Sequence, residues 1–445
     1  MRKKFRLEEY MIYKKSYEYL YCLKCIAELK MHQRKSKNQL LDIQLKKLKS
    51  LIVHSYEHVP YYRNLFDREN ISPDDIKKIE DLQKIPIINK KDIQANYDKI
   101  LANNIDKGKC KVTNTTGSTG IPLSVYSDKK SQMYSSSVVY YALMESGLRL
   151  KDKIVELAAL MEDCSGNLIK KDMVSVQDMP DNILRKLRES NPDILYSFPS
   201  IFKILSYEIN KFGINGYGIN GELLRPSNTR LIFTHGETLT QQCRDTIEST
   251  FRAKVYNTYG ATEFSRLAIE CEEHSGLHVI TDCAILELVK DGENVSPGEE
   301  GEIVVTGLYN YAMPLIRYKL GDIGVMSEED YKCPCGRGWP IIKSIEGRTD
   351  DFLTLPSGRV ISPRTINVID DIPGIIEYRT IQKKRDTFCV QVVPGNNYST
   401  ETDRQIEQQI RLGCVGENVN VEIELVNDIP RERTGKLKTI ISYVQ

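Results

Sequence analysis

Hydroxyl side chains and glycines are concentrated in one stretch, Thr113–Pro122, and this stretch constrains the chain more than any other. Such residues do not fill a hydrophobic core, whereas glycine lets the backbone approach a ligand closely and hydroxyl groups donate hydrogen bonds to oxyanions. The stretch therefore predicts a phosphate-binding loop, with an ordinary surface turn as the equal alternative. It is not a Walker loop, because Ile121 and Pro122 follow the second glycine. Its candidate contacts are Thr115, Thr116, Gly117, Ser118, Thr119 and Gly120.

The composition is that of a globular protein that binds small molecules. The 445 residues are enough for two or three domains, and 40% are apolar and 28% charged. A net charge of +1 creates no overall field that attracts nucleic acid. Eleven cysteines in a long chain without a secretory leader indicate a reducing compartment, so we predict a cytoplasmic location. No apolar run approaches the roughly 18 residues of a membrane span.

The first 50 residues have apolar side chains at helical spacing and predict two helices. Residues 1–30 also carry many lysines, arginines and tyrosines. We interpret them as the solvated face of packed helices, with weak contact to a membrane surface as the alternative.

Short strands and helices alternate after the glycine-rich stretch. A helix is predicted at 131–147, and strands at 154–160, within 193–200 and at 231–234, with a helix through Ile209. This alternation is typical of a mainly parallel sheet, in which ligands bind beyond the carboxyl ends of the strands. Gly236 and Glu237 follow one such strand and are therefore candidate ligand contacts. The neighbouring His235 is interpreted as satisfied by local contacts.

A second strand end is predicted after Asn257, where Tyr259-Gly260-Ala261-Thr262-Glu263 follows. Tyr259 offers an aromatic face, Thr262 a hydroxyl group, and Glu263 a carboxylate of the kind that binds magnesium. The alternative is a turn in which Glu263 faces a helix N-terminus.

Three cysteines and one histidine predict a structural zinc site formed by Cys271, His278, Cys333 and Cys335. Thiolates and imidazole suit tetrahedral zinc, and four protein ligands leave no open position. The site would connect two loops across a β-hairpin predicted at roughly 284–307. His274 is the rival fourth ligand, and four unrelated side chains with buried thiols are the alternative.

The last candidates are charged residues in polar loops. Asp322 ends a strand, with Arg317 as its expected electrostatic partner, and Lys436 follows a glycine in a basic run. The alternatives are a turn cap for Asp322 and solvated cations for the other two. The polar segment Gly347–Asp351 predicts a boundary between a larger domain, 1–348, and a small α+β domain, 349–445. In the small domain we expect a strand, a helix, two strands, a second helix and a last strand.

Five of these motifs, in this order, resemble those of the adenylate-forming superfamily, specifically its phenylacetate-CoA ligase branch and the related capsular-polysaccharide (CapK-like) proteins. The motifs span Thr113 to Lys436 and are Thr115–Pro122, Tyr259–Glu263, Pro314–Asp322, Gly347–Asp351 and Pro430–Lys436. The resemblance implies an α/β fold: a large N-terminal domain with mixed sheets and flanking helices, and a small mobile α+β C-terminal domain.

The resemblance also implies roles for individual residues. Gly236 and Glu237 would lie along the adenine pocket, Tyr259 would flank adenine, Gly260 would belong to the ATP-binding set, and Thr262 would contact the α-phosphate. Glu263 would hold magnesium, Asp322 would accept hydrogen bonds from ribose, and Asp350 would be the hinge. Lys436 would act in catalysis, and the branch's similar Cys and His set favours His278 as the zinc ligand. One departure is Ile121, which stands where the family often has lysine.

The predicted function is that of an ATP-dependent ligase. It would activate a carboxylic acid as an acyl-adenylate with release of pyrophosphate and transfer the acyl group to coenzyme A. One alternative is an acyl or amino-acid ligase that modifies a cell-surface polysaccharide precursor without coenzyme A. The other is a nucleotide-binding accessory protein without turnover.

Overall fold

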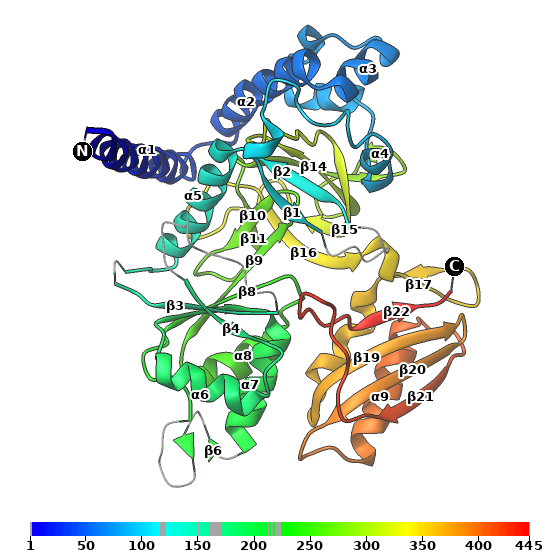
Figure 1. Cartoon of the computed structure of the whole chain (residues 1–445). Helices are drawn as coiled ribbons and strands as arrows, with labels where there is room; N and C mark the ends of the chain where they lie inside the picture. Colours follow the sequence, from blue (N-terminus) through cyan, green and yellow to red (C-terminus); the bar gives the residue numbers. More distant parts are fainter. Residues whose placement is uncertain are drawn as a thin grey trace. The chain divides into compact units, whose positions relative to one another are not determined.

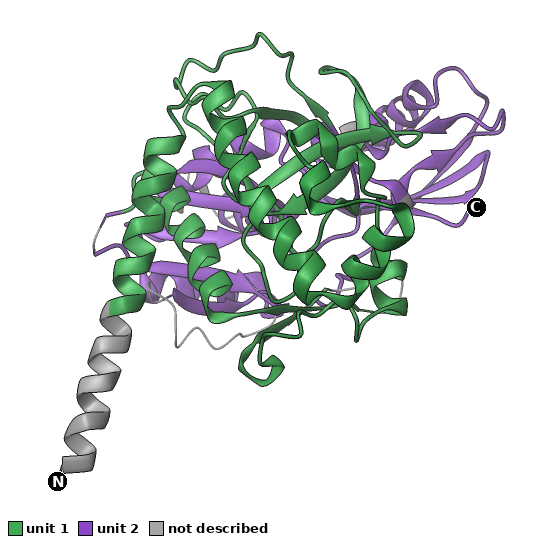
Figure 2. Ribbon diagram, turned by 90° about the horizontal axis from the view of Figure 1, so that it is seen from above, with its two compact units in different colours: residues 1–148, 259–320, 325–344 green, residues 149–258, 321–324, 345–445 purple. Residues whose placement is uncertain are grey.

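The computed structural model describes residues 2–115, 122–149, 151–159, 171–211, 213–214, 217–218 and 224–444. Its contacts divide the chain into two compact units (Figure 2). The first unit comprises residues 1–148, 259–320 and 325–344, and the second comprises 149–258, 321–324 and 345–445. The predicted boundary of a moving domain at residue 348 stays a prediction, and we describe each unit by itself.

The first unit begins with two helices, as the sequence predicts. They are α1 (Arg2–His32) and α2 (Lys37–His58), and α3 (Pro60–Glu69), α4 (Lys90–Ala95) and α5 (Lys129–Glu145) follow. Ser36 starts α2 with a capping box, in which its side chain and that of Gln39 satisfy each other's backbone N–H groups. No helix among the described residues is long and apolar enough to cross a membrane.

Antiparallel pairs connect strands of the first unit. The hairpin of β1 (Lys111–Asn114) and β2 (Ser124–Ser127) pairs Asn114 with Ser124. The predicted hairpin near residues 284–307 is confirmed, because β12 pairs with β14 from Ala284↔Gly307 to Val289↔Glu302. The remaining strands of this unit are β10 (Ser265–Glu270), β11 (Leu277–Val279), β12 (Ala284–Lys290), β13 (Glu293–Asn294) and β14 (Glu300–Gly307). Strands β15 (Tyr318–Met326) and β16 (Ile341–Arg348) begin in it and include residues assigned to the second unit.

The second unit contains the predicted parallel sheet. Its strands β3 (Ile154–Ala158), β4 (Lys171–Ser175), β5 (Ile194–Ser197), β8 (Leu231–His235) and β9 (Lys254–Ala261) pair in the order β4-β3-β5-β8-β9, all parallel (Figure 1). Helices α6 (Pro180–Ser190), α7 (Pro199–Lys211) and α8 (Gln241–Phe251) connect them. Apolar side chains of these strands and helices, among them Phe202, Ile232 and Phe251, form one buried core. The short strands β6 (Gly213–Ile214) and β7 (Tyr217–Gly218) pair beside it.

The C-terminal part of the second unit has a core of its own. A sheet in the order β21-β20-β19-β22 combines β19 (Ile375–Lys384), β20 (Thr387–Pro394), β21 (Asn420–Leu425) and β22 (Ile440–Ser442). Helix α9 (Thr400–Gly413) shares that core through Ile406 and Ile410. The first helix expected here is replaced by the short 3₁₀ turns Pro363–Thr365 and Asn367–Asp371, which follow the pair β17 (Leu353–Thr354) and β18 (Val360–Ile361). The α/β fold with a C-terminal α+β part is therefore as predicted.

A buried ion pair lies inside the first unit. Arg317 is 3% exposed, and its Nε donates to Glu287 at 3.1 Å while its Nη1 donates to the Ile85 carbonyl at 2.7 Å. Removing one partner of such a pair leaves an uncompensated buried charge, which is far more costly than losing an exposed pair.

We predict that Glu287→Ala lowers the free energy of unfolding of the first unit by about 3 kcal/mol or more. Urea denaturation of the full chain measures this change. The control is Glu302→Ala, which removes a partly exposed pair with Lys319 and should cost no more than about 1 kcal/mol. Equal effects of the two substitutions would contradict the prediction.

Candidate functional site

The glycine-rich stretch is described only at its ends. Thr116, Gly117, Ser118, Thr119 and Gly120 lie outside the described residues. Thr115 accepts the backbone N–H of Leu123 through Oγ1 at 2.8 Å, and its own N–H donates to the Leu123 carbonyl at 2.8 Å. The β1–β2 hairpin therefore fixes both ends of the predicted phosphate loop next to each other.

Glu237 stands just beyond the carboxyl end of β8, and its two oxygens have different partners. Oε2 accepts the N–H of Ser200, at the start of α7, at 3.0 Å. Oε1 accepts the N–H of Leu437, from the C-terminal part of the unit, at 2.7 Å. Burial raises the pKa of the Glu237 carboxyl, and the Leu437 N–H and the nearby Arg431 oppose this shift. Glu237 therefore joins the start of α7 to a loop near the C-terminus.

Its neighbours His235 and Gly236 pack against aromatic side chains. The His235 ring stacks on Tyr196 with centroids 4.7 Å apart and lies 4.8 Å from the ring of Phe198. Gly236 has φ +74°, and a Cβ there would meet the Phe198 ring at 3.0 Å. A side chain at position 236 would therefore be both strained and crowded.

The Tyr259–Glu263 motif lies at a turn in the first unit. Strand β9 continues through Ala261, so the expected strand end after Asn257 is corrected, and the turn closes with the Phe264 N–H donating to Ala261 at 3.0 Å. Gly260 is required by a close approach, since a Cβ would fall 2.0 Å from the Ser265 carbonyl oxygen. Thr262 is exposed, and Glu263 accepts a hydrogen bond from Tyr318 at 3.2 Å.

The predicted pairing of Arg317 with Asp322 is wrong. The Arg317 guanidinium is buried against Glu287 in the first unit, where it stabilises the fold. The cation beside Asp322 is Arg348, whose Nη1 lies 3.6 Å from Oδ1. The local sequence does not show whether an arginine is buried or exposed. Its charge partner therefore cannot be read from neighbouring residues.

Lys436 belongs to a tight loop in the second unit. The Glu432 N–H donates to the Lys436 carbonyl at 2.9 Å, and the Gly435 N–H donates to Glu432 at 2.8 Å. Gly435 has φ +88°, and a Cβ there would meet Val176, just past β4, at 2.7 Å. The loop thus lies against the ends of the parallel strands, and in Figure 1 the red segment before β22 passes the end of β8.

Asp350 lies in the 3₁₀ turn Thr349–Asp351, directly after β16. The next residue, Asp351, pairs with Lys438 at 2.8 Å. The proposed hinge therefore connects a long strand to a single turn.

The four predicted metal ligands meet in the first unit. Cys271, His278, Cys333 and Cys335 are all buried, and their ligand atoms lie within 4.8 Å of one another. The Sγ atoms of Cys271 and Cys333 are 3.6 Å apart, and Cys335 Sγ is 3.4 Å from His278 Nε2. These two separations are close to the edges of a zinc tetrahedron, which are roughly 3.5–3.8 Å for the usual bond lengths. His274 is outside the group and lies 3.2 Å from Glu270.

Burial governs the protonation of this group. It raises the pKa of Cys271 to about 12 and lowers that of His278 to about 4. Burial also opposes ionisation of Cys333, but hydrogen bonds from Ser275 and Cys335 outweigh it and lower its pKa. A neutral imidazole can bind a metal through its free nitrogen, whereas the thiols would have to lose their protons on binding one.

Sequence reasoning missed Ser200, Lys203 and Arg431, which bind the loop of Lys436 and the segment around Asp370. Arg431 Nη1 donates to Ser200 Oγ at 2.8 Å, and its other Nη contacts Glu377. Lys203 Nζ lies 2.5 Å from Asp370 Oδ1. The signal in the sequence is the helical spacing of Ser200 and Lys203, which many surface residues share.

Known proteins are similar to most of this chain. Residues 154–313 match the AMP-binding enzyme family, and residues 353–443 match the CapK C-terminal domain. The phenylacetate-coenzyme A ligase of Thermus thermophilus is 26% identical, with 91% of this chain and 97% of that protein covered. Protein CapK of Staphylococcus aureus is 24% identical, with 92% and 90% covered.

Solved structures have the same fold. A crystal structure of 2-hydroxyisobutyryl-CoA ligase in the postadenylation state matches with a TM-score of 0.77 at 20% identity, covering 92% of this chain and 91% of that one. The chain thus has a region that matches the AMP-binding enzyme family and a region that matches the CapK C-terminal domain. Over most of its length it is similar to phenylacetate-coenzyme A ligases and to protein CapK.

We predict about one zinc per chain in protein purified without chelator, measured by elemental analysis. His278→Ala should lose the metal because it removes one of four ligands, and His274→Ala should keep it. Loss of the metal should lower the thermal midpoint, since a closed tetrahedral site stabilises the fold. Zinc that survives His278→Ala, or protein without any metal, would show that the four side chains are not its ligands.

Proposed function

We propose that the protein is an AMP-forming acid ligase. The observation that carries this proposal is the position of the Lys436 loop, which Glu237 holds at the carboxyl ends of the parallel strands. Ligands of open α/β sheets bind at that edge. The matches to the AMP-binding enzyme family and to phenylacetate-coenzyme A ligases support the same activity.

In the first half-reaction, a carboxylate oxygen of the acid forms a bond to the α-phosphorus of ATP, and pyrophosphate leaves. Negative charge grows on the phosphoryl oxygens, so positive charge and hydrogen-bond donors at that point lower the barrier. We assign this task to Lys436 and to the hydroxyl of Thr262. Glu263 would hold magnesium, which would supply further positive charge beside the phosphates. The other expected ATP contacts are Thr115, Thr116, Gly117, Ser118, Thr119, Gly120, Gly236, Tyr259, Gly260 and Asp322.

In the second half-reaction, a nucleophile attacks the acyl carbon and AMP leaves with the bonding electrons. We propose the thiol of coenzyme A as the nucleophile, because two of the three similar proteins named above are CoA ligases. The match to the CapK C-terminal domain favours a second candidate, transfer to a polysaccharide precursor without coenzyme A. An accessory protein without turnover would release no pyrophosphate.

The cysteines and the N-terminal helix bear on the location of the protein and on its metal content. All ten cysteines that the structure describes are free thiols, which supports the proposed cytoplasmic location. We assign the Cys/His cluster to structural zinc that holds the first unit together. Weak contact of the N-terminal helix with a membrane surface stays an alternative for residues 1–30.

We predict that Lys436→Ala abolishes adenylate formation and leaves the fold intact, because the lysine acts in the transition state of the first step. ATP–pyrophosphate exchange over a panel of carboxylic acids measures this step. Omission of coenzyme A from full turnover shows whether coenzyme A is the acceptor. The control is Arg433→Ala, in the same loop and exposed. A loss below about tenfold in Lys436→Ala, roughly 1.4 kcal/mol, would contradict the assigned role.

We predict that Asp350→Pro affects the two half-reactions unequally. Proline fixes φ near −65° and restricts Thr349 before it, so it favours one position of the C-terminal part over another. Rapid-quench kinetics should show one half-reaction nearly normal and the other slowed by orders of magnitude. Asp350→Ala removes the same side chain without fixing φ and is the control. Equal slowing of both steps would make Asp350 a structural residue.

A further inference from the structure

Helix α1 exposes an apolar face between Leu20 and Met31. Leu20, Leu23, Ala27 and Met31 are spaced three and four residues apart, so they lie on one side of the helix. Leu20 is 66% exposed, Leu23 and Met31 are each 60% exposed, and Ala27 is exposed as well. We call these four residues the α1 stripe.

The opposite side of the helix is buried in the first unit. Cys22, Cys25 and Leu29 are buried there, and Cys22 Sγ donates to the Met133 carbonyl of α5 at 3.6 Å. Figure 2 shows this part of α1 along the margin of the first unit. Because the buried side fixes the rotation of the helix about its axis, the α1 stripe faces away from the core of the unit.

Lysines and tyrosines border the α1 stripe on both sides. Successive residues of a helix are about 100° apart around its axis, so Lys24 and Tyr17 lie along one border and Lys30 and Tyr19 along the other. All four side chains are exposed. A lysine can lay its stem along an apolar surface and keep its charge among polar groups, and tyrosine favours membrane–water interfaces. An apolar stripe with such borders is typical of a helix that lies in the plane of a membrane interface.

The charge of α1 favours an anionic partner. In the part from Tyr17 onward the two acidic residues are partly buried: Glu18 lies 3.2 Å from Lys129, and Glu28 lies 3.8 Å from Lys24. The sequence before Tyr17 adds six cationic residues and two acidic ones, namely Arg2, Lys3, Lys4, Arg6, Lys14 and Lys15 against Glu8 and Glu9. Two copies of the chain that met through this face would bring their cations together, which opposes such a dimer.

We propose that the α1 stripe and the lysines that border it bind the surface of a membrane that contains anionic lipids. The helix lies in the plane of the interface, with the stripe between the headgroups and the acyl chains. Lys24 and Lys30 lie among the anionic headgroups, which neutralise them. This proposal concerns where the protein works, and it does not depend on the reaction that the protein catalyses.

Flotation of the full chain with lipid vesicles tests the proposal. The vesicles contain either phosphatidylcholine alone or equal parts of phosphatidylcholine and phosphatidylglycerol. We expect the anionic vesicles to bind the protein at least about tenfold more tightly, and added salt to weaken this binding because it screens exposed charges. Leu20→Gln with Leu23→Gln should weaken the binding at least about tenfold, since these positions would no longer place apolar groups beside the acyl chains.

A second pair of substitutions tests the charges. Lys24→Gln with Lys30→Gln should lower the preference for anionic vesicles at least about fivefold. The controls lie in the second unit: Leu412→Gln, an exposed leucine of α9, and Lys384→Gln with Arg385→Gln, exposed at the end of β19. Both controls should bind vesicles like the unaltered protein. All these side chains are exposed, so we expect the thermal midpoint to stay unchanged in every variant.

Tryptophan fluorescence shows whether the α1 stripe itself enters the interface. The single tryptophan of the chain, Trp339, is buried, so its emission should not respond to vesicles. Leu23→Trp should shift its emission to shorter wavelengths when anionic vesicles are added, because the new ring leaves water. Leu412→Trp is the control and should show no shift.

Three results would overturn the proposal. One is equal binding, or no binding, to the two kinds of vesicle. Another is vesicle-bound protein in which the Leu23→Trp emission does not change, which would mean that a different surface binds. The third is protein that binds no vesicles but forms a dimer, in sedimentation velocity, that Leu20→Gln with Leu23→Gln dissociates; the stripe would then contact a second copy of the chain.

Discussion

The parallel strands of the second unit impose the constraint on which the site depends. Because β4, β3, β5, β8 and β9 run in one direction, their carboxyl ends lie along one edge, and the loops that follow them meet there. Glu237 reaches that edge from β8, and the start of α7 reaches it from β5. The Lys436 loop is far from them in the sequence, and the hydrogen bond from the Leu437 N–H to Glu237 holds it at the same edge. No single segment builds this arrangement.

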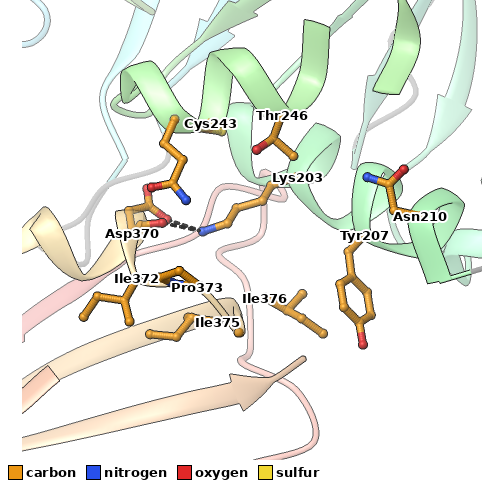
Figure 3. A pocket seen from close by; sticks show the side chains of 12 residues that line it. Lys203, Tyr207, Asn210, Cys243, Thr246, Asp370, Ile372, Pro373, Ile375 and Ile376 are labelled. Carbon is orange, nitrogen blue, oxygen red and sulfur yellow. Dashed lines mark hydrogen bonds and ion pairs between the residues drawn. The ribbon is translucent and has the colours of Figure 1, made fainter. Parts of the chain in front are cut away.

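The two kinds of contact in the second unit serve different purposes. Apolar cores stabilise each part, because burial of side chains such as Phe202 and Phe388 removes large apolar surfaces from water. The connection between the parts includes hydrogen bonds and ion pairs, such as that of Lys203 with Asp370, each with a net value of about 1 kcal/mol. Apolar side chains, among them Ile372 and Ile376, lie beside them (Figure 3).

In the first unit, buried polar groups fix geometry. Arg317 and Glu287 neutralise each other in the interior. The Cys/His cluster combines His278 of β11 with cysteines from two loops. Charged or ionisable groups stay buried only when partners compensate them, and the close spacing of the sulfurs and imidazole is what a shared cation would impose. Both features connect strands and loops of the first unit that are far apart in the sequence.

The sequence by itself determined the class of fold and the members of the Cys/His cluster. The α/β alternation follows from periodicity, and three thiols with one imidazole are a ligand set typical of structural zinc. The ordered motifs also pointed to the superfamily. The tertiary structure alone decided the partners of charged residues: Arg317 pairs with Glu287, Arg348 lies beside Asp322, and Glu237 holds the Leu437 N–H. Helix and strand periods are local properties of a chain, whereas the partner of a charge depends on which distant segments the fold brings within about 4 Å.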